Sequence, residues 1–373
     1  MNSWIEISKN AVINNINIFK NILGTSELAL VLKSNAYGHG LAEIYSIIKD
    51  QSIPNIAVAY LEEALYLRSQ GYKGSIFMLT PIFKEELDQA YSLNVEVIIG
   101  SFSFLKDWIQ SSKRPKAHIK IDSGLSRQGF CLDSVEKLSD VIIENNVQKD
   151  LVGVFTHFAN VEDVLEQDYA NQQIKIFNEA TSILEKKGIH LKKHAAASSA
   201  ILLLEDARFD MDRLGISLYG LWPSNLTRIS YLQSFKDILD LQPVLSWRSK
   251  ISSIKSVKAG VFVGYGCSYR TVKDTLIGVI PVGYYDGYRR AIGETKSYVL
   301  VRGQRAPLIG RVSMNLITVD LSNIEGVSEN DIVTLIGEDG SEFISASCFA
   351  EWAGTIHYEV LSGLNPKIKR IIV

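Results

Sequence analysis

The sequence has few cysteines, little net charge and no long apolar run. Its three cysteines, Cys131, Cys267 and Cys348, lie far apart in 373 residues without a metal-ligand spacing, so free thiols and a cytoplasmic location are expected. The net charge of −2 argues against nucleic acid or an anionic membrane as a partner. No apolar stretch has transmembrane length, and the first residues do not resemble a signal peptide. What remains is the composition of a globular protein, 46% hydrophobic and 21% charged.

Short apolar strands alternate with helical stretches through the first part of the chain. Such alternation favours right-handed crossovers and a parallel sheet. Eight units within roughly 220 residues predict a closed (β/α)8 barrel over residues 9–235. The alternative, a doubly wound open sheet, normally has a glycine-rich dinucleotide turn after its first strand, and none is present. The predicted strands are Leu28–Leu32, Ile56–Ala59, Ile76–Leu79, Val95–Ile99, Ala117–Ile121, Leu151–Thr156, His194–Ala196 and Arg213–Leu218.

Residues 236–373 have a different pattern, in which apolar runs are separated by turn residues such as Asp339-Gly340. This predicts a β-rich second domain with one late helix near Ala346–Gly354. Residues 1–8, which contain the alternating run Trp4–Ile7, are expected to join it. The predicted strands are Val244–Ile254, Leu276–Val282, Tyr298–Val301, Ala306–Val312, Ile317–Asp320, Ile332–Ile336 and Ile368–Val373.

The first barrel strand ends at a lysine. Lys33 follows the apolar run Leu28–Leu32, and small, turn-forming residues and a helical pattern come after it. Apolar surroundings disfavour an ammonium group, lower its pKa and make the amine a candidate for Schiff-base chemistry. The alternative is a surface lysine that caps the strand, which is the commoner case for an isolated strand-end lysine.

Further reactive side chains follow the other strands. The carboxyl ends of barrel strands meet at one face, where barrel enzymes carry their active sites. Ser198 and Ser199 occupy the expected N-cap of a short helix after the seventh strand, and Gly215 follows the eighth. Backbone N–H groups there suit a phosphate dianion. The alternative is that both serines only cap the helix.

Eight motifs in order make the whole chain similar to the alanine racemases, a family that uses pyridoxal 5'-phosphate (PLP). The motifs are VLKSNAYGHG, IKIDSGLSRQG, VFTHFAN, DRLGISLYGLWPS, VGYGCSY, IPVGYYDGY, GRVSMN and TIHYE. The resemblance implies that Lys33 holds PLP as a Schiff base and that Arg213 faces the pyridine nitrogen. It implies cofactor contacts, mostly to the phosphate, from Tyr37, His157, Ser198, Gly215, Ile216 and Tyr358.

The resemblance also implies the substrate-side residues. Arg127 and Met314 match positions near the substrate, and Lys120 matches a lysine that is carbamylated and pairs with the arginine. Tyr265 matches the second catalytic base, reaching the active site of the other subunit of a head-to-tail homodimer. Positions of the access gate and corridor are matched by Tyr284, Glu162, Arg290, Arg311 and Ile356.

Racemisation of alanine explains why two bases are needed. A proton leaves Cα on one face and returns on the other, so one lysine is not sufficient and Lys33 and Tyr265 are the expected pair. A free phenol has a pKa near 10, and lowering it to about 7 takes roughly 4 kcal/mol of preferential stabilisation of the phenolate. His157 is the candidate support, and a hydrogen-bonded core histidine is its alternative. The expected product, D-alanine, would supply cell-wall peptidoglycan.

Arg213 and Asp212 are neighbours on a strand, so their side chains face opposite sides. The pattern alone leaves open which one faces the cofactor. The resemblance selects Arg213, a donor-only group that leaves the ring nitrogen unprotonated and the ring a weaker electron sink. An inward-facing Asp212 would have the opposite effect.

Two departures from the family pattern bear on specificity. Ala197 stands where many members have asparagine, and Asn315 where aspartate is usual. Because a small pocket discriminates weakly against an added hydroxyl group, a serine/alanine or broader small amino-acid racemase is the first alternative. A PLP-dependent amino-acid decarboxylase and a non-enzymatic PLP-binding protein are more distant ones. The histidines His39, His118, His157 and His194 lie on separate elements, and no metal site is expected.

Overall fold

The computed structural model describes residues 2–162, 167–235, 238–292 and 297–373. Its contacts form two compact units. The first, called the barrel unit here, comprises Ala11–Ser34 and Tyr45–Gln242, and the second, the β unit, comprises Met1–Asn10, Asn35–Ile44 and Pro243–Val373. Asn35–Ile44 thus belongs to the β unit although it lies within the sequence range expected for the barrel. The expected boundary after residue 235 falls at 236–237, outside the described residues.

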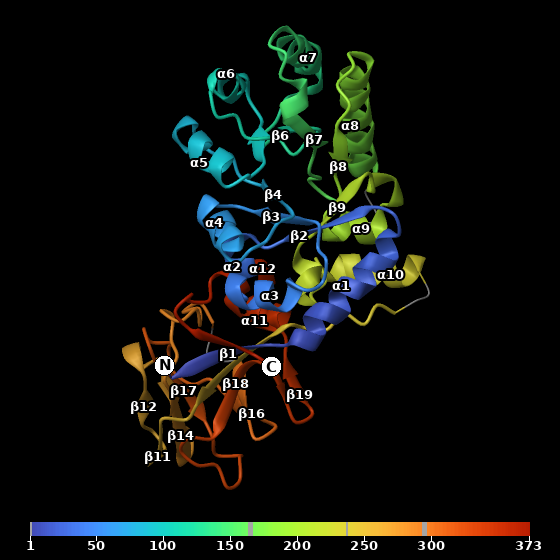
Figure 1. Ribbon diagram of the computed structural model, residues 1–373. Helices are drawn as coiled ribbons and strands as arrows, with labels where there is room; N and C mark the ends of the chain where they lie inside the picture. The colour runs from blue at the N-terminus through green and yellow to red at the C-terminus, as the bar shows by residue number, and fades with distance from the viewer. Residues whose placement is uncertain (1, 163–166, 236–237, 293–296) are drawn as a thin grey trace. The chain divides into compact units, whose positions relative to one another are not determined.

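Among the described residues, eight parallel strands form the barrel unit (Figure 1), which confirms the predicted (β/α)8 fold. Two four-stranded sheets, in the orders β4-β3-β2-β9 and β5-β6-β7-β8, are joined by the parallel bridges Phe77–Glu96 and Ala197–Arg213. The strands are β2 (Glu27–Val31), β3 (Asn55–Val58), β4 (Ser75–Met78), β5 (Val97–Ile99), β6 (Ala117–Lys120), β7 (Leu151–Phe155), β8 (Lys192–His194) and β9 (Met211–Leu214).

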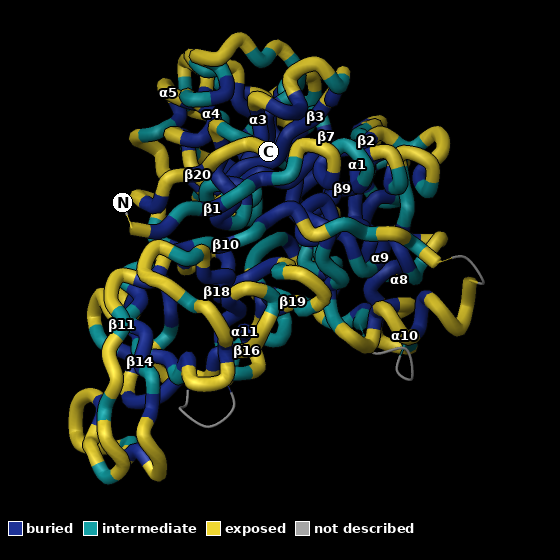
Figure 2. The backbone as a smooth tube through the Cα atoms, turned by 90° about the horizontal axis from the view of Figure 1, so that it is seen from below, coloured by how far each residue is buried: buried dark blue, intermediate teal, exposed yellow. Residues whose placement is uncertain are grey.

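Helices cover the outside of these strands because each has one apolar face. In α8 the buried residues recur every three or four positions, including Ile174, Phe177 and Leu184. Figure 2 shows the barrel strands as buried and much of the surrounding helical surface as exposed. The helices are α1 (Lys9–Leu23), α4 (Leu61–Ser69), α5 (Leu87–Ser92), α6 (Phe102–Gln110), α7 (Val135–Glu144), α8 (Asp168–Lys186), α9 (Ser198–Leu203) and α10 (Asn225–Ser234).

The β unit is built on a sheet in the order β16-β15-β18-β10-β1-β20, with β19 paired to β18. The N-terminal strand β1 (Ser3–Ile7) lies antiparallel to β10 (Leu245–Lys250) and parallel to β20 (Lys369–Ile372). The other strands of this sheet are β15 (Tyr298–Val301), β16 (Gln304–Pro307), β18 (Ile332–Asp339) and β19 (Glu342–Ile344).

Smaller elements complete the β unit. A second sheet contains β11 (Ser253–Val257), β14 (Thr275–Ile280) and β17 (Ile317–Asp320), and a hairpin contains β12 (Phe262–Val263) and β13 (Tyr269–Arg270). The helices are α3 (Leu41–Ile48), which continues into the barrel unit, α11 (Ala346–Ala353) and α12 (His357–Ser362). No helix in the described ranges is long and apolar enough to cross a membrane.

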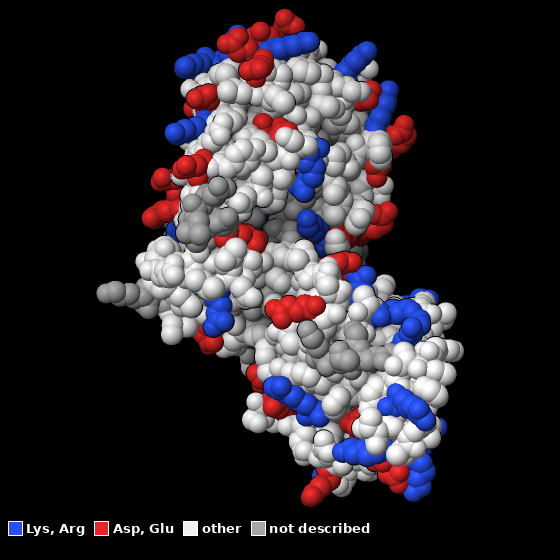
Figure 3. Space-filling model, turned by 180° about the vertical axis from the view of Figure 1, so that it is seen from behind, with Lys and Arg blue, Asp and Glu red and all other residues white. Residues whose placement is uncertain are grey.

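Some predicted strands differ in extent from the observed ones. The run Arg213–Leu218 is strand only to Leu214, since Gly215 turns the chain into the 3-10 helix η5 (Ile216–Tyr219). The run Val244–Ile254 is divided into β10 and β11. On the face seen in Figure 3, side chains of both charge signs are interspersed, as the small net charge leads one to expect.

Candidate active site

Lys33 lies two residues after β2 and begins α2 (Lys33–Tyr37), which is a left-handed turn. Ser34, Asn35, Ala36 and Tyr37 all have φ between 52° and 56°. Four consecutive residues other than glycine in this region are unusual, since each costs roughly 1–2 kcal/mol. Such strain persists only where the surroundings impose it, and it is concentrated at functional sites.

Contacts within the β unit hold the strained turn. Nδ1 of His39 donates to the carbonyl of Ala36 at 3.0 Å, and Oδ1 of Asn35 accepts from the backbone N–H of Leu41 at 2.8 Å. The buried guanidinium of Arg370 donates to the carbonyl of Gly38 at 2.9 Å. A Cβ at Gly38 would lie 1.9 Å from the carbonyl oxygen of Leu361, so only glycine fits there.

Five basic groups influence one another in the barrel unit. The pKa of Lys33 is lowered by burial and then by the charges of Arg127 and Arg213, with Glu63 opposing. The pKa of His157 is held well below its usual value by burial, then by Arg213, Lys120, Arg127 and Lys33. The field here favours anionic groups such as phosphate and carboxylate, and it favours a neutral amine on Lys33.

Lys120 is the most isolated of these basic groups. Its side chain is 2% exposed, and its Nζ makes no hydrogen bond to any described residue. The nitrogen lies 4.5 Å from the ring centroid of Phe155. Burial, followed by the charges of Arg213 and Arg127, lowers the pKa of Lys120 well below its usual value. A buried amine of this kind is a polar group that still needs a partner.

Arg213, on β9, is buried, and both of its terminal nitrogens contact polar groups of the barrel strands and the loops after them. Its Nη2 donates to the carbonyls of Thr156 at 2.9 Å and Ala195 at 2.7 Å, and its Nη1 contacts Nδ1 of His194 at 2.7 Å. Asp212 instead accepts from the hydroxyl of Ser26 at 2.7 Å. Burial raises the pKa of Asp212 to about 6. The two neighbours therefore have separate surroundings, as residues on opposite faces of a strand do.

Ser198 does not cap its helix. The N-cap of α9 is Ala197, and Oγ of Ser198 accepts from the backbone N–H groups of Gly215 at 3.1 Å and Ser217 at 3.3 Å. Ser199 donates to the carboxylate of Glu162 at 3.5 Å. The expectation that the two serines are caps is wrong, because these contacts direct the hydroxyl of Ser198 to the turn after β9 and that of Ser199 to Glu162. Ser198, Gly215 and Ile216 thus lie around one turn of backbone N–H groups.

The aromatic residues predicted for the site lie in the β unit. Tyr37 and Tyr358 have ring centroids 6.2 Å apart. Tyr265 is 69% exposed and lies in a short 3-10 turn between Gly264 and Gly266, which have φ values of 77° and 73°. An added Cβ at Gly266 would lie 3.0 Å from Nη1 of Arg311, so this arginine packs directly on the turn.

Two of the gate residues of the β unit, Arg290 and Tyr284, contact the segment 312–314. Nη1 of Arg290 donates to the carbonyl of Val312 at 2.7 Å, and the backbone N–H of Tyr284 donates to the carbonyl of Ser313 at 3.0 Å. Met314 is 54% exposed, and Ile356, the N-cap of α12, is also exposed.

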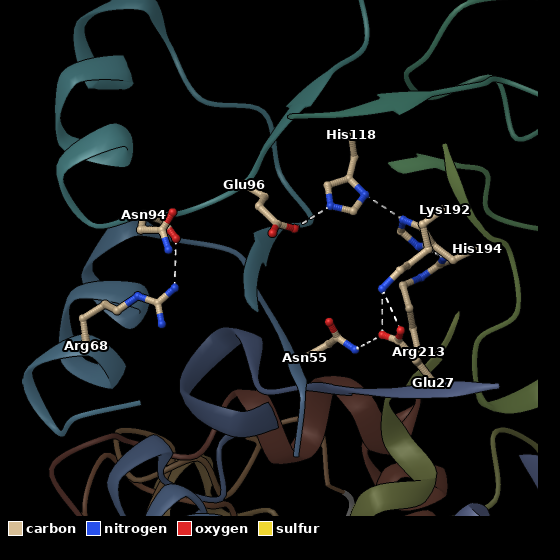
Figure 4. A network of polar contacts seen from close by, with 9 residues as sticks. All are labelled: Glu27, Asn55, Arg68, Asn94, Glu96, His118, Lys192, His194 and Arg213. Carbon is tan, nitrogen blue, oxygen red and sulfur yellow. Dashed lines mark hydrogen bonds and ion pairs between the residues drawn. The ribbon is translucent and has the colours of Figure 1, made fainter. Parts of the chain in front are cut away.

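One group of residues was not anticipated from the sequence. Glu96, His118 and His194 form a hydrogen-bonded chain that ends on Arg213 (Figure 4). Both histidines are buried side chains on barrel strands, His118 on β6 and His194 on β8. A histidine inside the barrel needs a polar partner, and a histidine within a predicted barrel strand was the available signal.

Comparison with known families agrees with the motifs. The family model described as alanine racemase, N-terminal domain, matches residues 7–223, and the one described as alanine racemase, C-terminal domain, matches residues 244–372. An alanine racemase of Leptospira interrogans is 39% identical over 376 residues, covering 100% of this chain and 96% of the relative. One from Carboxydothermus hydrogenoformans is 34% identical, covering 99% of each.

Solved structures are similar over the same extent. The alanine racemase of Bacillus anthracis with bound L-Ala-P has a TM-score of 0.91 and 32% identity, covering 100% of this chain and 95% of that one. The enzyme of Clostridium difficile 630 in complex with cycloserine has a TM-score of 0.88 and 30% identity, covering 100% and 96%. Two family models and full-length relatives thus agree with the barrel and the β unit described above, and the chain belongs to the alanine racemase family.

Proposed function

We propose that this protein interconverts L-alanine and D-alanine with PLP as cofactor, in the cytoplasm, and that the D-alanine serves peptidoglycan synthesis. The observation that carries the proposal is the full-length match to alanine racemases together with a strand-end lysine of lowered pKa in the barrel unit. The three cysteines are free, in keeping with a reducing compartment.

The residues present fit a phosphate-bearing aldehyde cofactor. Lys33 supplies an amine with a lowered pKa. The backbone N–H groups of Gly215 and Ser217, which donate to Oγ of Ser198 here, are proposed to turn to a bound phosphate together with that hydroxyl group and the N–H of Ile216. Tyr37 and Tyr358, whose rings lie near each other, are proposed to contact the same phosphate. When bound, PLP withdraws electrons from the substrate and acidifies its Cα–H.

Arg213 is proposed to hold the ring nitrogen in its neutral form. A guanidinium has donors and no acceptor, so a lone pair that faces it stays available and unprotonated. The pKa of Arg213 is lowered to about 10 by burial, and the group therefore stays charged near neutral pH. This limits electron withdrawal and disfavours side reactions such as transamination.

Two bases are proposed to act on opposite faces of the substrate. Lys33, in its neutral form, takes the Cα proton on one face, and Tyr265 of the partner subunit serves the other. The exposure of Tyr265 and Met314 in a single chain supports a surface that a second copy covers in a head-to-tail homodimer. His157, neutral because of burial and nearby cations, is proposed to support the phenolate through Arg213.

Lys120 is proposed to be carbamylated. A neutral, buried amine reacts with carbon dioxide, and the resulting anion gives Arg127 a partner and removes a like-charge contact from the site. Arg127 and Met314 are then available to the substrate. Tyr284, Glu162, Arg290, Arg311 and Ile356 are proposed to line the access route.

The test begins with the purified protein and PLP. We expect a visible absorption band that Lys33→Ala abolishes, and D-alanine formation from L-alanine that depends on PLP. L-Serine is measured in parallel. Equal rates with serine and alanine would replace the alanine-specific proposal by the broader racemase. If neither D-alanine nor D-serine formed, both proposals would be refuted.

A further inference from the structure

Four polar side chains form a continuous line through the barrel interior. Oε2 of Glu96 lies 2.7 Å from Nε2 of His118, and Nδ1 of His118 lies 3.0 Å from Nε2 of His194. Nδ1 of His194 lies 2.7 Å from Nη1 of Arg213. Figure 4 shows the four groups in sequence, beginning beside β5, crossing β6 and β8 and ending on β9.

Arg213 determines which ring nitrogen carries the proton in each histidine of the line. A guanidinium only donates, so Nδ1 of His194 accepts and its proton lies on Nε2. That proton is donated to Nδ1 of His118, whose own proton therefore lies on Nε2 and is donated to Glu96. Burial and the charge of Arg213 lower the pKa of His194 well below its usual value, which agrees with a neutral ring.

The line connects a buried cation to a partly exposed anion. The Glu96 side chain is 17% exposed, and its pKa is lowered by hydrogen bonds from His118 and Ser75 although burial opposes this. Aligned hydrogen bonds polarise one another in a low-dielectric interior. The charge of Glu96 therefore strengthens the acceptor that His194 presents to Arg213.

Aromatic rings isolate the line from water. Phe155 stacks on His194 with ring centroids 4.8 Å apart, and Phe77 lies 5.2 Å from His118. Gly153 provides the space for His118, because a Cβ there would lie 2.2 Å from its Nδ1. A displaced histidine would leave the Nε2–H of His194 buried and unsatisfied.

We propose that Glu96 and His118 are positioning residues for the racemase reaction, acting through His194 on the orientation and donor strength of Arg213. The inference rests on the proposed function, because it takes Arg213 as the contact of the cofactor ring. It assigns to the amino-terminal end of the barrel a part in reactivity that is otherwise placed at the carboxyl-terminal end.

The protonation pattern is tested directly in the wild-type protein. With ¹⁵N-labelled histidine, the chain gives signals from only six imidazole rings. We expect His118 and His194 to be neutral with the proton on Nε2 in both. If His118 or His194 were doubly protonated, or carried its proton on Nδ1, the proposal would be overturned whether or not the protein racemises alanine.

The effect on reactivity is tested with a charge removal and a matched control. Glu96→Gln should lower kcat roughly tenfold, as expected for weakening a hydrogen bond to a charged group, with KM changed less than about twofold. It should also shift the visible band of the bound cofactor. The control is Glu27→Gln, which removes the charge of an exposed carboxylate at the start of β2 that accepts hydrogen bonds from Lys192 and Asn55. The control should leave the band and kcat as in wild type.

Two further variants separate positioning from folding. His118→Asn keeps an acceptor near His194 and removes the link to Glu96, whereas His118→Phe removes both. We expect kcat to fall and the visible band to shift in both variants, and more so in His118→Phe than in His118→Asn. Thermal unfolding measurements identify any variant that does not fold. Gly153→Ala should shift the visible band in the same way, because its Cβ displaces His118 although none of the four residues of the line is substituted. If folded Glu96→Gln and His118→Asn kept the wild-type band and the wild-type kcat, the proposal would be overturned. The line would then contribute only to packing.

Discussion

The pKa of the Lys33 amine is lowered by burial and by two neighbouring guanidinium groups. The lowered pKa means that the neutral, nucleophilic form appears at lower pH than in a free lysine, whose pKa is near 10.4. We expect the rate of PLP capture by the apoprotein to rise with pH through a midpoint below that value. Arg127→Leu removes one repelling charge and should move this midpoint upward. An unchanged midpoint in Arg127→Leu would contradict the electrostatic explanation.

Lys120 gives a second prediction at the scale of single residues. Its buried nitrogen makes no hydrogen bond to a described residue, and a carbamate would give it charge-assisted partners. Protein exposed to ¹³C-bicarbonate should show a carbamate carbon signal that is absent from Lys120→Met. We expect this variant to lose roughly tenfold in activity, because Arg127 loses an ionic hydrogen-bond partner. A wild-type spectrum without this signal would contradict carbamylation.

At the scale of elements, the left-handed turn after Lys33 is the most constrained feature. In Gly38→Ala the new Cβ would collide with the carbonyl of Leu361, and φ is +81°. We expect a loss of about 3 kcal/mol or more in the free energy of unfolding. Gly354→Ala is the matched control in the same unit, since its φ is +67° and no atom lies within 4 Å. Its expected loss is about 1 kcal/mol, from backbone strain alone. Equal losses in denaturant titrations would show that the contact with Leu361 has little effect.

Elements also show what sequence patterns predict well. Apolar runs predicted the number of barrel strands and most of their positions, since parallel strands buried on both faces read as continuous apolar segments. The exception is β8, Lys192–His194, which shares only His194 with the predicted strand His194–Ala196 because it begins with two lysines. They did not predict the left-handed conformation of Ser34–Tyr37, which only Asn35 among these residues adopts readily and which tertiary contacts impose. The hydrogen bonds of the Ser198 hydroxyl group could likewise not be predicted from the sequence, because they depend on where the turn after β9 lies. The line from Glu96 to Arg213 joins residues more than a hundred positions apart, and only the closed barrel brings them together.

At the scale of the whole molecule, two copies of the chain are predicted to share their active sites. Lys33 and Tyr265 belong to different units, and the proposal pairs each Lys33 with Tyr265 of the partner subunit. Lys33→Ala and Tyr265→Ala each lack one of the two bases. Each variant should therefore racemise alanine more slowly than the wild type. Within a mixed dimer of the two variants, one site would contain both substitutions and the other would contain neither.

Mixing the two variants after dissociation and reassociation is the most direct test of this arrangement. Random exchange between symmetric dimers should restore roughly a quarter of the wild-type sites, measured as D-alanine formed from L-alanine. Reassociated samples of each variant alone should regain nothing. Recovery near a quarter is the result that the shared-site account predicts. No recovery in a mixture shown by mass spectrometry to contain the mixed dimer would contradict it, because both bases would then come from the same chain.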